Sequence, residues 1–166
     1  MIRVDIETII MAAGPVPSVI VLRERSSESE TGAPLRSLSI QTGSYEAASV
    51  SHGIDSGQKG RPITADLLLN AVRSLGAKLE RIEINRAEPP VFFANVVLVA
   101  ADGSEVTVDA RPSDALALAV RANAPMFVED ELMNRLGTVA LQHDESDDSE
   151  LEKFDEFVQT LSPDDF

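Results

Sequence analysis

The chain has 166 residues, a hydrophobic fraction of 43% and a net charge of −14, so it can bury a sizeable core. It contains no cysteine, which excludes disulfides and thiolate-bound zinc, and no apolar run approaches membrane-spanning length. The acidic balance argues against long-range attraction to nucleic acid, which would need a local basic cluster or bridging divalent cations. The N-terminus reads as a strand and not as a signal peptide, so we expect a cytoplasmic protein that does not enter a membrane.

The first half of the chain alternates strand-like and helix-like patterns. Two helices are predicted here, one over 44–54 with Ser44 as its N-cap, and one over 64–75 with Thr64 as its N-cap and Gly76 at its end. The strands alternate apolar and polar residues between turns rich in Gly, Pro and Ser; they cover residues 2–12, 18–25 and 35–43.

The second half continues the mixture of strands and helices. The strand over 91–100 is almost continuously apolar, which favours a central place in a sheet, and Asp102-Gly103 predicts a hairpin after it. The remaining elements are strands over 78–87, 104–110 and 126–128 and helices over 112–122 and 129–137. This order predicts an α+β fold: a single domain over residues 1–140 with a mixed, largely antiparallel sheet and packed helices.

The last part of the chain carries most of the acidity. Residues 143–166 hold ten acids and one base, a charge of −9, which leaves −5 for residues 1–142. Residues 141–150 are predicted to be an acidic linker, and residues 151–166 to be an amphipathic helix and tail. The apolar stripe of that helix is Leu151, Phe154, Phe157, Val158 and Leu161. A helix this short needs a packing partner, either the body of the protein or another protein.

A polar cluster separates the strand over 104–110 from the helix that follows it. Pro112 suits the first turn of a helix, Ser113 and Asp114 can bind free backbone N–H groups, and Asn123 can end the helix, so helix initiation alone explains much of the cluster. Arg111 is different, because a cation beside the positive end of a helix needs a partner. Asp109 or Asp114 can supply a bidentate ion pair.

Several segments resemble the bifunctional nuclease domain family. The most specific is VDARPSDALALAVRANAPMFVEDELM, and LRSLSIQTGSYEAASV, RPITADLLLNAVRSLGAKLERIEI and FFANVVLV resemble other parts of the same domain. The resemblance covers roughly residues 1–140 and implies a nuclease that acts on DNA, RNA or both. One position differs: where the family is expected to read Thr-His-Asp, this chain has Thr64-Ala65-Asp66.

The resemblance suggests a divalent-metal-dependent hydrolysis of phosphodiesters, because no cysteine and no well-placed histidine is present. His52 lies at a helix end and His143 in the acidic linker. Mg²⁺ or Mn²⁺ is the expected cofactor, and no nucleotide cofactor is expected. The candidate catalytic residues are Asp109, Arg111, Ser113 and Asp114; the candidate phosphate-binding residues are Arg61 and Arg111; the candidate metal ligands are Glu46, Asp66, Asp109 and Asp114.

Two other functions are compatible with the residues. One is a non-catalytic, homo-oligomeric binding or regulatory module whose acidic tail engages a protein partner, with the polar cluster serving as a structural ion pair. The scarcity of stacking residues, one tyrosine and no tryptophan, favours this over nucleic-acid binding. The other is a sensor of small anions that uses the same arginines and a helix N-terminus. A homo-oligomer is expected in either case.

Overall fold

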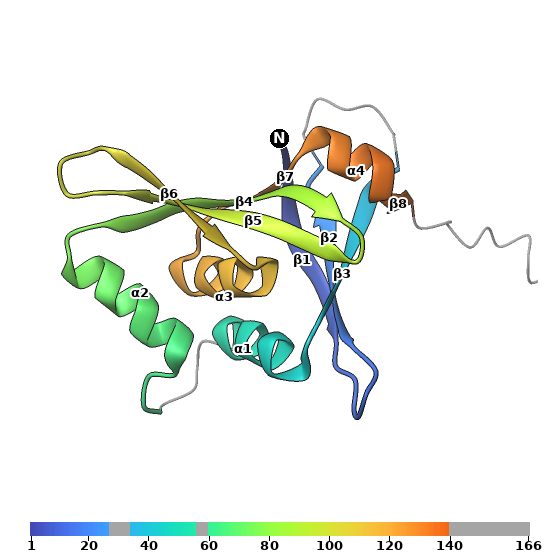
Figure 1. Ribbon diagram of the computed structural model, residues 1–166, viewed down its shortest axis with the longest axis horizontal. Helices are drawn as coiled ribbons and strands as arrows, with labels where there is room; N and C mark the ends of the chain where they lie inside the picture. Colours follow the sequence, from blue (N-terminus) through green and yellow to red (C-terminus); the bar gives the residue numbers. More distant parts are fainter. Residues whose placement is uncertain (27–33, 56–59, 140–166) are drawn as a thin grey trace, which may run out of the picture.

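The predicted strands and one further short strand form one eight-stranded sheet in the computed structural model, which describes residues 1–26, 34–55 and 60–139 (Figure 1). The strands are β1 (Ile2–Ile10), β2 (Ser18–Glu24), β3 (Arg36–Thr42), β4 (Lys78–Glu88), β5 (Val91–Val99), β6 (Glu105–Ala110), β7 (Met126–Val128) and β8 (Thr138–Val139). The helices are α1 (Ser44–Ile54), α2 (Thr64–Ser74), α3 (Pro112–Ala122) and α4 (Asp130–Leu136). The predicted α+β class is therefore confirmed.

The sheet is mixed and largely antiparallel, as predicted. Its strand order is β6-β5-β4-β7-β1-β2-β3-β8, and β4 and β7 form the parallel pair. The prediction that the apolar strand β5 is central was wrong, because β5 lies next to the edge strand β6. Its apolar character has another cause: α3 packs against it and against β4.

Three helices cover one face of the sheet. Figure 1 shows α1, α2 and α3 on the same side of β4 and β5, whereas α4 lies on the other side, against β3 and β4. The core forms where α3 meets the sheet, and Leu116, Ile82 and Ile84 have no exposed surface. A bulge in β4 between Leu79 and Arg81 shifts the alternation by one residue. The bulge lets Leu79 pack against the same core as Ile82.

The helix ends differ from the sequence prediction at their N-termini. The N-cap residues are Gly43 and Ile63, one residue before the predicted Ser44 and Thr64, and neither cap makes a side-chain hydrogen bond. Asp66 instead accepts a hydrogen bond from the backbone N–H of Ile63 at 2.9 Å, which caps α2 from within its first turn. Asn123 ends α3 with a φ of 52°, as predicted for a left-handed terminator.

The helices α1 and α3 lie side by side and point the same way. Near their N-termini Glu46 of α1 contacts Arg111, and near their C-termini Gly53 of α1 faces Val120 and Arg121 of α3. Both N-termini therefore lie at one end of the helix pair, and both C-termini at the other. Glycine at residue 53 leaves the room that this close approach requires.

The predicted linker over 141–150 and the predicted helix over 151–166 lie outside the described residues. Within the described ranges, no helix has the length and apolar character needed to cross a membrane. The short strand β8, which pairs with β3, has no counterpart in the sequence prediction, because two residues are too few for a readable alternation.

Replacing Gly53 by alanine tests the close packing of α1 on α3. A Cβ atom at residue 53 would lie 2.5 Å from Nη1 of Arg121 and 2.6 Å from Cγ2 of Val120. We expect this overlap to lower the free energy of unfolding by about 1–3 kcal/mol in urea denaturation, despite the better helix propensity of alanine. Gly60→Ala is the control, since a Cβ there meets no described atom within 4 Å. Equal stability of the two variants would contradict the packing argument.

Candidate functional site

The polar cluster at the start of α3 is organised by the guanidinium of Arg111. Its Nε and Nη2 donate to the two carboxylate oxygens of Asp114 at 2.6 and 3.0 Å, and its Nη1 donates to Glu46 at 3.1 Å. Asp114, then Glu46, hold the pKa of Arg111 above its usual range. Of the two predicted partners for Arg111, the structure assigns the bidentate pair to Asp114. The Arg111 side chain is 64% exposed, so solvent and solutes reach it.

The ion pair lies where two helices begin. Neither Gly43 at α1 nor Arg111 at α3 makes a side-chain capping bond, so neither N-cap side chain occupies the backbone N–H groups of the first turns. In α3 these donors begin at Ser113, because Pro112 at the first helical position has no N–H. The two helix dipoles add positive potential at this end, which Glu46 and Asp114, both in first turns, complement. A Cβ at residue 43 would meet the carboxylate of Glu46, so the glycine lets that carboxylate lie close to the backbone at the start of α1.

A cavity of about 300 Å³ opens between the two helix starts, and we call it the N-terminal cavity. Ser113 lies on its wall and is buried. The polar or charged residues that line it are Gln41, Thr42, Glu46, Arg111 and Ser113. The structure therefore brings Glu46, Arg111, Ser113 and Asp114 together, four of the residues predicted from sequence to form a site.

Asp109 lies in a different environment. It is exposed on the edge strand β6 and lines a mostly apolar cavity of about 490 Å³ between α2, α3 and the sheet. Asp114 also lines this cavity, and so does Ala65. The histidine expected at residue 65 from the family resemblance would therefore stand in the same cavity as Asp109 and Asp114.

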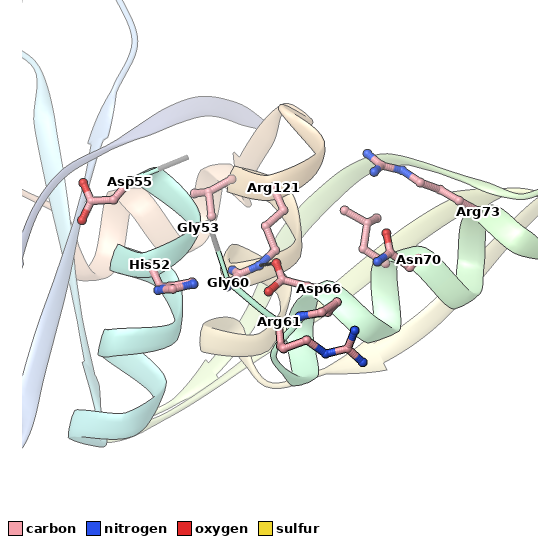
Figure 2. Close-up of a pocket in the computed structure, with 12 residues that line it drawn as sticks. His52, Gly53, Asp55, Gly60, Arg61, Asp66, Asn70, Arg73 and Arg121 are labelled. Carbon is pink, nitrogen blue, oxygen red and sulfur yellow. Dashed lines mark hydrogen bonds and ion pairs between the residues drawn. The ribbon is translucent and has the colours of Figure 1, made fainter. Parts of the chain in front are cut away.

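Arg61 and Asp66 lie at the other end of the helix pair. They line a cavity of about 370 Å³ together with His52, Arg73 and Arg121 (Figure 2). The Arg121 side chain is only 6% exposed, and its Nε donates to Asp66 at 2.6 Å. Arg61 therefore does not join Arg111 in one phosphate clamp, and Asp66 does not join Glu46 and Asp114.

The predicted metal ligands do not form one centre. In the part of the chain that the structure describes, no three Asp, Glu or His side chains gather as a group able to hold an ion. Of the predicted ligands, Glu46 and Asp114 are bridged by the guanidinium of Arg111. A divalent cation between these carboxylates would have to displace Arg111, so the residues present do not fit a preformed metal site.

Sequence reasoning missed Arg121, which binds three helices. Besides Asp66 of α2, its guanidinium donates to the backbone carbonyls of Ser49 in α1 at 2.9 Å and Ala117 in α3 at 2.8 Å. The available signal was a single arginine in a run of alanine, leucine and valine from 115 to 122. A cation among apolar helix residues is buried only when it has a partner.

The comparison with known proteins finds a family model that covers most of the chain. The model of the bifunctional nuclease domain matches residues 20–140. The chain belongs to the bifunctional nuclease domain family. The matched range contains the N-terminal cavity, the ion pair of Arg111 with Asp114, and both ends of the α1–α3 pair.

Two proteins of Mycobacterium tuberculosis are similar to the chain over most of its length. They are the uncharacterized protein MT1877 of strain CDC 1551 / Oshkosh and the uncharacterized protein Rv1829 of strain ATCC 25618 / H37Rv. Each is 33% identical over 156 residues, which is 89% of this chain and 87% of the relative. This similarity extends the family relationship beyond the matched domain.

The Asp66–Arg121 pair makes stability depend on pH. The N–H of Ile63, then Arg121, lower the pKa of Asp66 below 3.8, so the pair contributes fully above that pH and its contribution is lost as the pH falls through the folded-state pKa. We expect Asp66→Asn to lower the free energy of unfolding at neutral pH by about 3 kcal/mol, because it leaves Arg121 buried without a counter-ion. The difference from the unmodified chain should shrink below pH 3.8.

The control for this variant is Asp55→Asn. Asp55 lines the same cavity but is exposed and has no ion pair with any described residue. Urea denaturation at several pH values compares the three proteins. A stability difference for Asp66→Asn that stays constant through the acid range would show that the carboxylate charge is not what stabilises Arg121.

Proposed function

We propose that the chain is a nuclease that hydrolyses phosphodiester bonds of DNA, RNA or both, with the scissile phosphate bound at the N-terminal cavity. Membership of the bifunctional nuclease domain family supports this. The single observation that carries the placement is the position of Arg111: an exposed guanidinium stands at two uncapped helix starts. A guanidinium fork and free backbone N–H groups are the donors that a phosphate prefers.

Arg111 is suited to exchange partners. The side chain of its partner Asp114 is 49% exposed and that of Glu46 is 28% exposed, so the ion pair is not sealed from water. An incoming phosphate takes the place of Glu46 at Nη1 of Arg111, so one charge-assisted hydrogen bond is replaced by another of similar strength and the Glu46 carboxylate is released. Arg111 then binds the phosphate, and Asp114 keeps the guanidinium oriented through its hydrogen bonds from Nε and Nη2.

Glu46 is the proposed general base. Its carboxylate lies beside Arg111 and lines the N-terminal cavity. Once phosphate displaces it from Arg111, it can accept a proton from a water molecule that attacks phosphorus, while the bond from phosphorus to the leaving oxygen breaks and that oxygen takes up a proton from solvent. Ser113 lies on the same wall and can donate its hydroxyl hydrogen to a phosphate oxygen. Negative charge that develops on the phosphate is stabilised by the helix starts and Arg111.

Dependence on Mg²⁺ or Mn²⁺ stays a prediction. The described residues do not offer a preformed set of ligands, and none of the steps above uses an ion. Comparison of Mg²⁺, Mn²⁺ and EDTA in the same cleavage assay tests the prediction directly.

The second candidate function is a non-catalytic binding or regulatory module. The observation that favours it is the saturation of Arg111, whose Nε, Nη1 and Nη2 already bond to two carboxylates. In that case the cluster would fix the ends of α1 and α3, and the chain would bind a partner without turnover. The predicted protein partner of the tail is part of this alternative, whereas the predicted homo-oligomer is compatible with both functions.

Cleavage of labelled single- and double-stranded DNA and RNA tests the proposed function. We expect Arg111→Gln to slow cleavage by about 10²-fold, because it removes the cationic donor to the phosphate, and Glu46→Gln to slow it by about 10²-fold or more. Arg25→Gln is the charge-matched control, since Arg25 forms an exposed ion pair with Asp5 after β2. Circular dichroism checks that each variant is folded.

The outcome separates the two functions. Cleavage that the Arg25→Gln protein keeps and the Arg111→Gln protein loses supports the nuclease. Absence of cleavage by the unmodified chain with Mg²⁺, Mn²⁺ and EDTA, or equal cleavage by all variants, would contradict it and favour the binding module.

A further inference from the structure

The one tyrosine of the chain stands beside the proposed phosphate site. Tyr45 lies in the first turn of α1, directly before Glu46, and it is 89% exposed. The chain has no tryptophan, and most of its other large apolar side chains at the helix pair pack inward. An aromatic ring left almost fully in water adds nothing to the core, and its face is accessible to a ligand.

Tyr45 forms one side of a groove that continues from the N-terminal cavity. The groove has a volume of about 490 Å³, and Gly43, Glu46 and Gln41 line both the groove and the cavity. Three surface turns meet there: the turn between β1 and β2, the start of α1, and the turn between β4 and β5. Besides Tyr45, the apolar residues on its walls are Pro15, Val16, Pro17 and Pro90.

The composition of the groove fits a flat, partly polar ring. Proline and tyrosine present rigid faces, which lose little conformational freedom when a planar group packs on them. Gln41 is exposed on the same wall and offers an amide that both donates and accepts hydrogen bonds. Apart from Glu46, the groove has no charged side chain among the described residues.

We propose that this groove binds an unpaired nucleobase of a single-stranded nucleic acid, stacked on the ring of Tyr45. The base belongs to the strand whose phosphate occupies the N-terminal cavity, so the inference rests on the proposed function and adds its substrate class. Because Tyr45 and Glu46 are consecutive residues, the stacking ring and the phosphate site are adjacent, as a base and its backbone are. A base inside a duplex presents only its edges in the grooves, whereas an unpaired base presents a face.

The positive end of the helix pair selects this occupant over an apolar peptide. The start of α1 lines the groove, and the groove continues into the N-terminal cavity, which is lined by Arg111 and the start of α3. These groups favour a ligand with negative charge next to its flat ring. Nucleotides combine these two properties. Gln41 can then bond the edge of the base, which gives the groove a preference among bases.

Quenching of a fluorescent base tests the stacking. The probe is a single-stranded oligonucleotide that contains 2-aminopurine, whose emission falls when the base stacks on an aromatic ring. We expect the full chain to quench the probe, Tyr45→Phe to retain the quenching because the ring is kept, and Tyr45→Ala to lose it and to bind about tenfold more weakly. Leu75→Ala is the control, since Leu75 is 82% exposed at the end of α2.

A second measurement uses cleavage and keeps the two proposals separable. For the chain and its variants, KM and kcat are measured on single- and double-stranded substrates of one sequence. Stacking predicts that Tyr45→Ala raises KM for the single strand about tenfold, with a smaller effect on the duplex. Tyr45→Phe and Leu75→Ala should resemble the unmodified chain.

Each outcome bears on one proposal or on both. Cleavage and quenching that Tyr45→Ala leaves unchanged would overturn the stacking site while the nuclease proposal stands. Quenching that depends on the ring without any cleavage would support the stacking site and contradict the nuclease. Neither binding nor cleavage by the unmodified chain would overturn both, and tight binding of an apolar peptide in place of the oligonucleotide would overturn the choice of occupant.

Discussion

The guanidinium of Arg121 is the contact on which the arrangement of the helices depends. It is almost completely buried and reaches α1 through Ser49, α2 through Asp66, and its own helix α3 through Ala117. Burial of a cation is unfavourable unless acceptors meet its donors, and Nε and Nη1 of Arg121 have acceptors whereas its Nη2 has none among the described residues. The helices α1 and α2 are therefore stable against α3 only in positions that supply these acceptors. Gly53 allows the approach, because any side chain there would collide with Arg121.

The position of the site follows from that constraint. With the C-terminal ends of α1 and α3 held together at Arg121, the two parallel helices also begin together, and their uncapped N-termini meet at the N-terminal cavity. The single helix α3 thus has a structural arginine at one end and an exposed one at the other. Arg121 is enclosed and cannot exchange its partners without unfolding the helix contacts, whereas Arg111 is solvated and can.

Features of the fold that depend on neighbouring residues were predictable from sequence, and contacts between residues far apart in the sequence were not. Helix α3 was bounded correctly because Pro112 and Asn123 act through the backbone of their own turns. The bidentate pair of Arg111 with Asp114 was among the predicted alternatives because its partners are three residues apart. Asp66 was placed in the first turn of α2, but its partner Arg121 is 55 residues away, and no local pattern identifies such a pair. Strand order was likewise beyond reach, since β7 joins β1 and β4 through long-range pairing.

The negative charge of the chain is compatible with a phosphate site of this construction. Charges on the body act on a polyanion over a distance of about one Debye length, roughly 8 Å at physiological ionic strength, and beyond that they are screened. Within that distance, donors in contact with phosphate outweigh more remote carboxylates, because the interaction energy falls with separation. A chain with a charge of −14 therefore gains little from electrostatic steering toward nucleic acid. In the proposed function, recognition instead rests on short-range contacts: the fork of Arg111, the backbone N–H groups of two helix starts and a stacking ring. Such contacts favour a flexible single strand that can fit into a groove over a rigid duplex.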